Sequence, residues 1–263
     1  MDFTDDQLER YARHIILKEV GGAGQAALMR SRVLVIGAGG LGAPLLMYLA
    51  AAGVGTIGIV DDDRVELSNL QRQIVHETPA VGRMKTESAA ERLAAINPDV
   101  TVVPHSVRLE PGNASALIAG YDLVADGSDR FETRFLVNDT CVALGRTLVS
   151  AALGPYEGQL ATFRPQDGTP ERPLPCYRCF VPEDPGEDHQ RTCSDSGILG
   201  AVAGVMGALQ AMEVIKEILG LGDSLAGHLL LYDALSASTR RVRLPADPRC
   251  PVCGPGARER VTG

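Results

Sequence analysis

Short apolar runs alternate along the first 151 residues with segments whose apolar positions recur at helical spacing. Residues 33–36 are all Val, Leu or Ile, which is typical of a strand buried on both faces. The same pattern predicts further strands at 56–60, 101–107, 121–125 and 147–151, and helices at 43–52, 84–96, 112–119 and 130–144. Strands and helices that alternate in this way predict an α/β fold with a doubly wound, mostly parallel sheet.

The two ends of the chain follow different patterns. Residues 4–20 predict an amphipathic helix that Thr4 and Gln7 cap and that the glycines at 21, 22 and 24 end. Beyond residue 151 we expect a C-terminal β extension, with strands at 159–163, 228–232 and 239–244, and one helix at 198–219. The Pro-rich stretch 165–193 predicts a long loop, of a kind that is commonly functional. We therefore expect one domain in three parts, with the bounds 1–24, 30–151 and 152–263.

Composition narrows the classes of function. The chain of 263 residues has a formal net charge of −8, 4% aromatic residues and no Trp, which disfavours binding to nucleic acid. Residues 33–60 carry no charge, but their glycines and a proline argue against a membrane-spanning helix, and we expect no membrane association. The acidic N-terminus lacks the order of a signal peptide, so we expect a cytoplasmic protein without disulfides.

A glycine-rich motif follows the first predicted strand and opens a predicted helix. Its glycines are Gly37, Gly39, Gly40 and Gly42, in the pattern G-x-G-x-x-G. Asp61 follows Gly37 by 24 residues, close to the spacing of a carboxylate that binds a ribose. Glycines allow a tight turn, and the helix N-terminus presents N–H donors to an anion. The motif therefore predicts a Rossmann-like site for an adenosine-containing ligand, and leaves NAD, FAD and ATP open.

Polar residues follow the second and fourth predicted strands. The loop after the second strand includes Asn69, Gln71 and Arg72, and Lys85 comes soon after it. Two cations near one crevice suit a triphosphate, although such side chains are also common on a solvated surface. Asp129 follows the fourth strand, where a carboxylate can hold Mg²⁺, cap the next helix, or do both.

The cysteines divide into two pairs and two single residues. Cys176 with Cys179, and Cys250 with Cys253, form two C-x-x-C pairs that predict a structural zinc site with four thiolate ligands. Such a site would join the Pro-rich loop to the C-terminal tail. Cys141, in an apolar helix, is expected in the core. The five histidines show no metal-binding spacing and are interpreted as structural or surface residues.

The combination of motifs resembles the ThiF/MoeB/HesA family, the bacterial relatives of ubiquitin-activating enzymes. The resemblance rests on GAGGLG, D-x-D-x-V-x-x-SNLQRQ, V-G-x-x-K, D-G-S-D-R and the two C-x-x-C pairs, and it extends from Tyr11 to Gly254. It implies ATP-dependent adenylylation of the C-terminal glycine of a ubiquitin-like sulfur carrier of the MoaD or ThiS type, which ends in Gly-Gly. The implied pathways are molybdopterin, thiamine and thiolated-tRNA synthesis, with release of pyrophosphate.

The resemblance also implies roles for particular residues. Asp61 would bind the ribose, and Gly40 would approach the nucleotide. The phosphates would be held by Asn69, Arg72 and Lys85, and Asp129 would hold Mg²⁺. Arg13 would reach into the site of a partner subunit, which implies a homodimer. Cys193 would form a thioester or persulfide with the carrier, as in some family members, or be dispensable, as in others. The catalytic residues expected in this way are Arg13, Arg72, Lys85, Asp129 and Cys193. The expected ATP-binding residues are Gly37, Gly39, Gly40, Gly42, Asp61, Asp63, Ser68, Asn69, Gln71, Arg72, Lys85, Asp129 and Arg130.

Two other functions fit parts of the sequence. An NAD-dependent oxidoreductase would explain the glycine motif and Asp61, but it gives no reason for the cations at 72 and 85. A non-catalytic, zinc-stabilised module that binds a ubiquitin-like partner would tolerate the loss of Arg72 and Asp129, which are both present.

Overall fold

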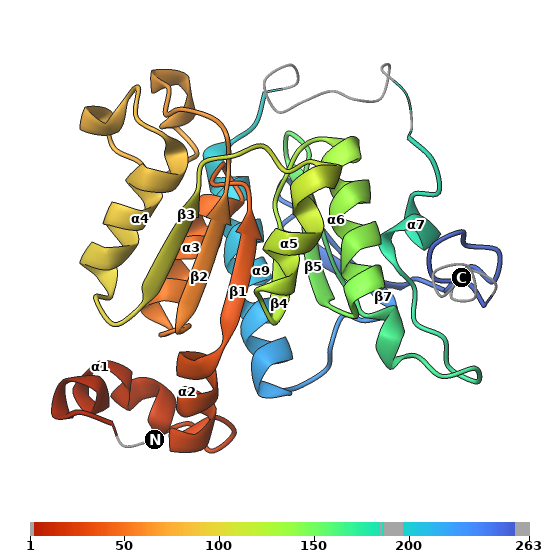
Figure 1. Cartoon of the computed structure of the whole chain (residues 1–263), viewed down its shortest axis with the longest axis horizontal. Helices are drawn as coiled ribbons and strands as arrows, with labels where there is room; N and C mark the ends of the chain where they lie inside the picture. The colour runs from red at the N-terminus through yellow and green to blue at the C-terminus, as the bar shows by residue number, and fades with distance from the viewer. Residues whose placement is uncertain (1–2, 185, 187–196, 256–263) are drawn as a thin grey trace.

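A single eight-stranded sheet forms the centre of the computed structural model, which describes residues 3–184, 186 and 197–255 (Figure 1). The strand order is β3-β2-β1-β4-β5-β6-β7-β8, and β1 to β5 run parallel while β6, β7 and β8 are antiparallel. The strands are β1 Arg32–Ile36, β2 Thr56–Val60, β3 Thr101–His105, β4 Leu123–Asp126, β5 Thr147–Leu153, β6 Glu157–Phe163, β7 His228–Asp233 and β8 Ser238–Arg243. The expected α/β fold, with a β extension at its C-terminal side, is confirmed.

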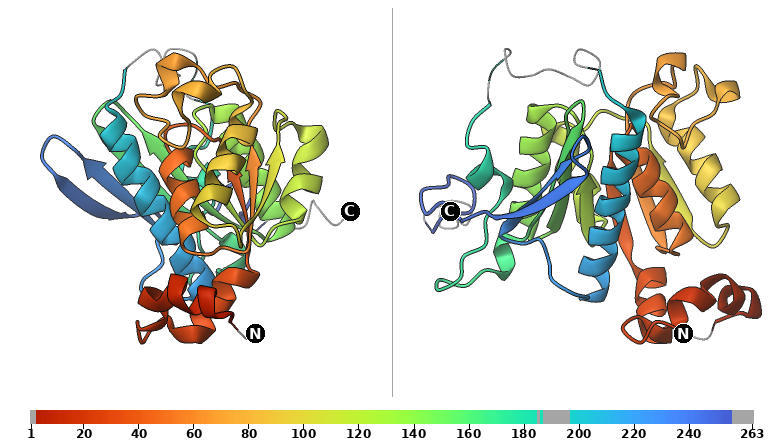
Figure 2. Two further views of the ribbon diagram at one scale, coloured as in Figure 1. Left: turned by 90° about the vertical axis from the view of Figure 1, so that its left-hand side faces the viewer. Right: turned by 180° about the vertical axis from the view of Figure 1, so that it is seen from behind.

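Helices cover both faces of the sheet, as Figure 2 shows from two further sides. On one face of the sheet α3 packs on β1 and β2, α4 on β3, and α9 on β5 and β6. On the other face α6 packs on β4 and β5, and α5 packs against α6. The helices are α3 Gly42–Ala51, α4 Lys85–Ile96, α5 Pro111–Ala119, α6 Phe131–Leu144, α7 Tyr177–Phe180 and α9 Gly200–Leu219. Their bounds and those of the strands differ from the predicted ones by at most two residues, except for α7, which lies in the stretch predicted as a loop. Among the described residues, no helix combines the length and apolarity that crossing a membrane requires.

The N-terminal region contains two helices where the sequence predicts one. The capping box of Thr4 and Gln7 is present, but α1 (Asp5–Ile15) ends before the predicted residue 20. The glycines expected to end helical structure instead lie in a second helix, α2 (Gly21–Arg30). The prediction was wrong because tertiary packing overrides the low helix propensity of glycine. Gln25 of α2 is fully buried and donates a hydrogen bond to the Ala52 carbonyl, and Leu28 is part of the core.

Two glycines of α9 provide a matched test of how closely this helix packs against the start of α3. A Cβ at Gly207 would lie 2.5 Å from the Leu41 carbonyl oxygen and would also overlap Pro44, whereas a Cβ at Gly204 would have no neighbour within 4 Å. We predict that Gly207→Ala lowers the free energy of unfolding by roughly 1–3 kcal/mol through overpacking. Gly204→Ala should raise it by up to about 1 kcal/mol, since alanine is the better helix former. Urea denaturation measures both, and equal effects of the two variants would contradict this packing.

Candidate active site

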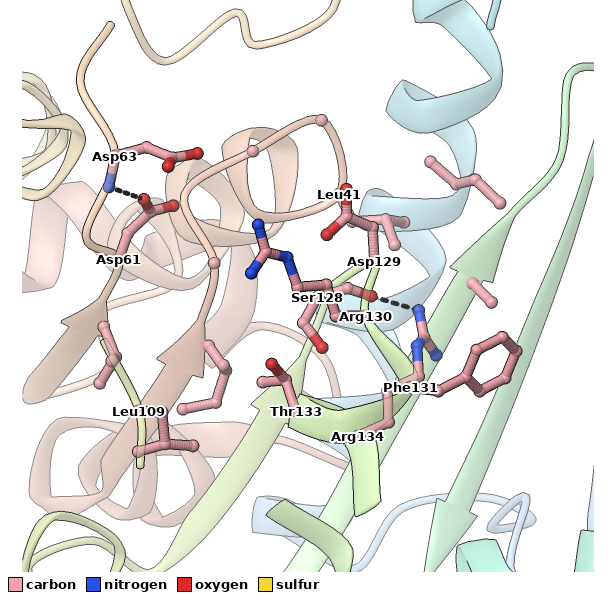
Figure 3. Close-up of a pocket in the computed structure, with 18 of the residues that line it drawn as sticks. Leu41, Asp61, Asp63, Leu109, Ser128, Asp129, Arg130, Phe131, Thr133 and Arg134 are labelled. Carbon is pink, nitrogen blue, oxygen red and sulfur yellow. Dashed lines mark hydrogen bonds between the residues drawn. The ribbon is translucent and has the colours of Figure 1, made fainter. Parts of the chain in front are cut away.

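A cavity of about 770 Å³ opens at the carboxyl ends of the parallel strands (Figure 3). It lies where the order of the sheet reverses, because β1 pairs with β2 on one side and with β4 on the other. Open α/β sheets bind their ligands at such a point, and the volume is that of a small-molecule site. Figure 3 shows Asp61 and Asp63 on one side of the cavity, and Asp129, Arg130 and Arg134 on the other.

The glycine-rich turn forms one wall of the cavity. Gly37 has a φ of +92°, which an L side chain rarely adopts, and its N–H donates to the Val60 carbonyl at 2.8 Å. A Cβ at Gly42 would collide with the Gly37 carbonyl oxygen, so the turn requires glycine there. Gly37, Gly39 and Gly40 line the cavity, and α3 begins directly behind them. The backbone is thus arranged to let a ligand approach a helix N-terminus closely.

Asp61 holds the glycine-rich turn against the end of β2. Its carboxylate accepts hydrogen bonds from the N–H groups of Ala38, at 2.8 Å, and Asp63, at 2.9 Å. Burial raises the pKa of Asp61, while the charge of Lys85 and these two hydrogen bonds lower it. The structure therefore assigns Asp61 a structural role in this turn, and its predicted contact with a ribose stays a prediction.

The two predicted cations meet at the same cavity. Lys85, at the start of α4, has a side chain only 7% exposed, and its Nζ lies 2.7 Å from a carboxylate oxygen of Asp63. The alternative that it is a solvated surface cation is therefore wrong. Arg72 also lines the cavity, and its guanidinium donates to the Ser68 carbonyl at 3.2 Å.

Part of the polar loop after β2 does not line the cavity. Ser68, Asn69 and Gln71 are absent from the lining, and Gln73 is present in it. The Asn69 side chain instead accepts a hydrogen bond from the Glu66 N–H and so caps the short helix η1 (Leu67–Asn69). The sequence could not separate local capping from ligand binding here because the same polar residues serve both. The phosphate contact of Asn69 stays a prediction.

The turn between β4 and α6 brings Asp129 and Arg130 to the cavity. Asp126, which is fully buried, holds this turn in place. Its carboxylate accepts hydrogen bonds from the Ser128 N–H, at 2.9 Å, and the Ser150 hydroxyl, at 3.4 Å. The expected N-cap role of Asp129 is wrong, because α6 begins one residue later and its N-cap is Arg130, without a side-chain hydrogen bond. The exposed Asp129 carboxylate thus lines the cavity and does not cap the helix.

Several cavity residues were not predicted from the sequence. Val107, Arg108 and Leu109 follow β3, and Arg134 and Tyr177 come from α6 and α7. No motif marked them, because the sequence shows that a residue belongs to a helix or loop but not where its side chain points. Arg134, only 7% exposed, donates hydrogen bonds to the carbonyl oxygens of Ser128 and, at 2.9 Å, Ala151.

Arg13, one of the predicted catalytic residues, does not meet the others. Arg13 is exposed on α1, which contacts the C-terminal end of α4 through the hydrogen bond of Arg10 to the Ile96 carbonyl. That end of the molecule is opposite the carboxyl ends of the strands (Figure 1). Arg13 therefore does not line the cavity of its own chain. Cys193 lies outside the described residues.

The four paired cysteines come together although two of them lie more than 70 residues from the other two. Their Sγ atoms all lie within 4.8 Å of one another, with 3.6 Å between Cys176 and Cys250 and 3.4 Å between Cys179 and Cys253. Sulfurs around a tetrahedral Zn²⁺ are about 3.8 Å apart, since each Zn–S bond is about 2.3 Å. The donors and their spacing therefore fit this ion. Hydrogen bonds from the Cys176 and Cys253 thiols lower the pKa of Cys179, while hydrogen bonds within the cluster and burial raise the pKa of Cys176 and Cys253.

The remaining described cysteine and the described histidines have structural contacts, as expected. Cys141 is buried in the core, and burial raises the pKa of its thiol. His76 is buried between the Ala38 carbonyl and the Ser88 hydroxyl, and burial lowers its pKa. His14 contacts Gln25, and His105 contacts Tyr121.

Comparisons with known proteins extend these observations. The model of the ThiF family matches residues 11–252. The chain is 49% identical over 263 residues to a sulfur carrier protein adenylyltransferase of Thermus thermophilus, which covers 99% of this chain and 97% of that protein. It is also 49% identical over 250 residues to the SAMP-activating enzyme E1 of Haloferax volcanii, over 95% of this chain and 90% of that protein.

A solved structure agrees with the fold. The structure of E. coli MccB with AMPCPP and MccA superposes with a TM-score of 0.80 over 96% of this chain and 75% of that chain. At 23% sequence identity this likeness establishes the shared architecture.

Proposed function

Because this chain belongs to the ThiF family, we propose that it is an ATP-dependent adenylyltransferase acting on the C-terminal glycine of a ubiquitin-like sulfur carrier. The names of its two relatives, sulfur carrier protein adenylyltransferase and SAMP-activating enzyme E1, support this activity. The observation that carries the proposal is the meeting of Arg72, Lys85 and Asp129 at one cavity beside the glycine-rich turn.

The reaction brings two anions together. The terminal carboxylate of the carrier attacks the α-phosphate of ATP, a carrier acyl-adenylate forms, and pyrophosphate leaves. Cations aimed at the phosphates are needed because the carboxylate and the triphosphate repel each other, and preorganised charges in a water-poor site lower that barrier. Lys85 is nearly buried and has a fixed partner in Asp63, so it is held in place before substrate arrives.

We assign the phosphates to Arg72 and Lys85, together with the N–H groups of the glycine-rich turn. Arg130 lines the same cavity and adds a third cation. Asp129 would hold Mg²⁺, which prefers carboxylate and phosphate oxygens and would neutralise charge on the leaving pyrophosphate. Asp61 would bind the ribose while its carboxylate keeps the turn in place through the N–H groups of Ala38 and Asp63.

Arg13 belongs to the proposal through a second copy of the chain. It is exposed on α1, and α1 lies at the end of the molecule opposite the carboxyl ends of the strands (Figure 1), so Arg13 can reach a cavity only in a partner subunit. A homodimer in which each N-terminal helix completes the other site would satisfy this geometry. Cys193 keeps both of its predicted possibilities, covalent attachment to the carrier or no catalytic role.

The cluster of four cysteines is proposed as a structural zinc site. When bound, Zn²⁺ in a closed four-thiolate site supplies stability and no open coordination position for catalysis. Its ligands, Cys176, Cys179, Cys250 and Cys253, would join the start of α7 to the C-terminal tail.

The alternative function, an NAD-dependent oxidoreductase, is not favoured, because it gives no role to the cations that line the cavity.

Adenylylation can be measured as exchange of labelled pyrophosphate into ATP with a carrier ending in Gly-Gly. Arg72→Ala and Asp129→Asn should each lower the exchange rate by about 100-fold, the size of effect seen when one charge-stabilising group is removed. Arg83→Ala is the matched control, because this exposed arginine pairs with Glu91 and does not line the cavity. Unchanged exchange in the first two variants, or hydride transfer with NAD, would contradict the proposal.

The contribution of Arg13 across subunits can be tested by mixing variants. Arg13→Ala and Arg72→Ala should each be inactive as homodimers. In a mixed dimer, one site combines the intact Arg72 of one chain with the intact Arg13 of the other. Random mixing after subunit exchange should therefore recover about a quarter of the wild-type exchange activity. Recovery that does not exceed the sum of the two separate variants would show that Arg13 does not act across subunits.

Metal analysis tests the zinc site. Freshly purified protein should contain one Zn²⁺ per chain, and Cys176→Ser should lose it and melt at a lower temperature, because metal binding contributes folding free energy. Cys141→Ala, which removes a thiol elsewhere in the core, should keep its metal. Protein purified without chelator that contains no zinc would rule out the assignment.

A further inference from the structure

The peptide group between Ala38 and Gly39 lies at the boundary between the core and the cavity. Ala38 is fully buried, whereas Gly39 lines the cavity. Among the described residues, neither the Gly39 N–H nor the Gly40 N–H has a hydrogen-bond partner. These two donors are therefore available to a ligand, and the direction in which each points decides whether a ligand can use it.

A histidine binds this peptide group from the protein side. The Nε2 of His76 lies 3.0 Å from the Ala38 carbonyl oxygen, and its Nδ1 lies 3.0 Å from the Ser88 hydroxyl. Since a carbonyl oxygen can only accept, Nε2 carries a proton and is the donor, and in the neutral ring Nδ1 accepts from Ser88. His76 is 6% exposed and does not line the cavity, so both contacts are made inside the protein.

The contact with His76 fixes the direction of the Gly39 N–H. In a trans peptide group the C=O and the following N–H point in opposite directions, and the described residues contain no cis peptide bond. Because the Ala38 carbonyl points to His76, the Gly39 N–H points away from that ring. The preceding peptide group is fixed as well, since the Ala38 N–H donates to the Asp61 carboxylate at 2.8 Å.

Glycine gives this peptide group a second accessible orientation. A flip of the Ala38–Gly39 peptide changes mainly the ψ angle of Ala38 and the φ angle of Gly39, and glycine adopts φ values of either sign. After such a flip the Ala38 carbonyl oxygen would face away from His76 and would repel a phosphate, while the Gly39 N–H would point inward. The hydrogen bond from His76 opposes this flip at a position where no side chain of residue 39 can.

The partner of His76 lies close to a cation of the same site. Ser88 follows Lys85 by three residues on α4, which is about one helical turn. The start of this helix therefore supplies Lys85, which lines the cavity, and Ser88, which holds the His76 ring.

We propose that His76 is a positioning residue that turns the Gly39 N–H toward a phosphate group of the bound nucleotide. Its effect passes through the Ala38–Gly39 peptide group, because the ring itself does not reach the cavity. That the nucleotide is ATP rests on the function proposed above, whereas the hydrogen bonds of His76 do not.

Equilibrium binding of ATP and of adenosine, measured by calorimetry without a carrier, tests this role. His76→Phe keeps a buried ring and removes the donor to Ala38. Its affinity for ATP should fall about ten-fold, the effect of one hydrogen bond to a charged group. Its affinity for adenosine, which has no phosphate, should stay that of the wild type. His76→Gln, whose amide N–H reaches as far as Nε2, should restore most of the ATP affinity.

His105→Phe is the matched control, because this imidazole contacts Tyr121 and does not line the cavity. It should bind both ligands like the wild type. If His76→Phe does not fold, His76→Asn replaces it, since the shorter amide reaches the position of Nδ1 but not that of Nε2. This variant should bind ATP less tightly than His76→Gln, and adenosine equally well.

The comparison of the two ligands separates positioning from general damage to the site. Equal losses of ATP and adenosine affinity would overturn the proposal, and so would an unchanged ATP affinity in the variants that lack the donor. Wild-type protein that binds ATP no more tightly than adenosine would overturn it as well. Binding needs no carrier, so a wild-type protein that binds ATP but fails in pyrophosphate exchange would contradict the proposed function and not this role of His76.

Discussion

The tight turn from Gly37 to Gly42 is the constraint on which the cavity depends. It changes a buried strand into a helix within a few residues, and it fits only because Gly37 adopts a positive φ and Gly42 has no side chain to meet the Gly37 carbonyl. The Asp61 carboxylate ties this turn to the end of β2. The helix N-terminus thereby faces the switch point of the sheet, where an anion can approach it.

Electrostatic balance explains the composition of the cavity. An acidic chain of net charge −8 repels ATP and a carboxylate at long range, so local cations must dominate at the site. Lys85 is held and oriented by Asp63, and the Asp126 carboxylate is used within the protein to hold the turn before α6. The carboxylate left to face the cavity on that turn is Asp129, where a divalent cation would be most useful.

The C-terminal part of the chain does more than extend the sheet. Its α7 segment contributes Tyr177 and Phe180 to the wall of the cavity, and the cysteines on either side of Tyr177 lie beside those of the tail at residues 250–253. The cysteine cluster and the cavity are therefore neighbours through α6.

The sequence by itself determined the parallel α/β order, the glycine-rich turn, the pairing of the cysteines and the meeting of Arg72, Lys85 and Asp129 at the cavity, because these depend on local patterns and fixed spacings. Tertiary structure decided what such patterns cannot express. It turned the glycines after α1 into part of a helix by burying Gln25, and it used Asn69 as a cap and not as cavity lining. It also aimed Arg134 and Tyr177 into the cavity, since the direction of a side chain depends on packing between elements that are distant in sequence.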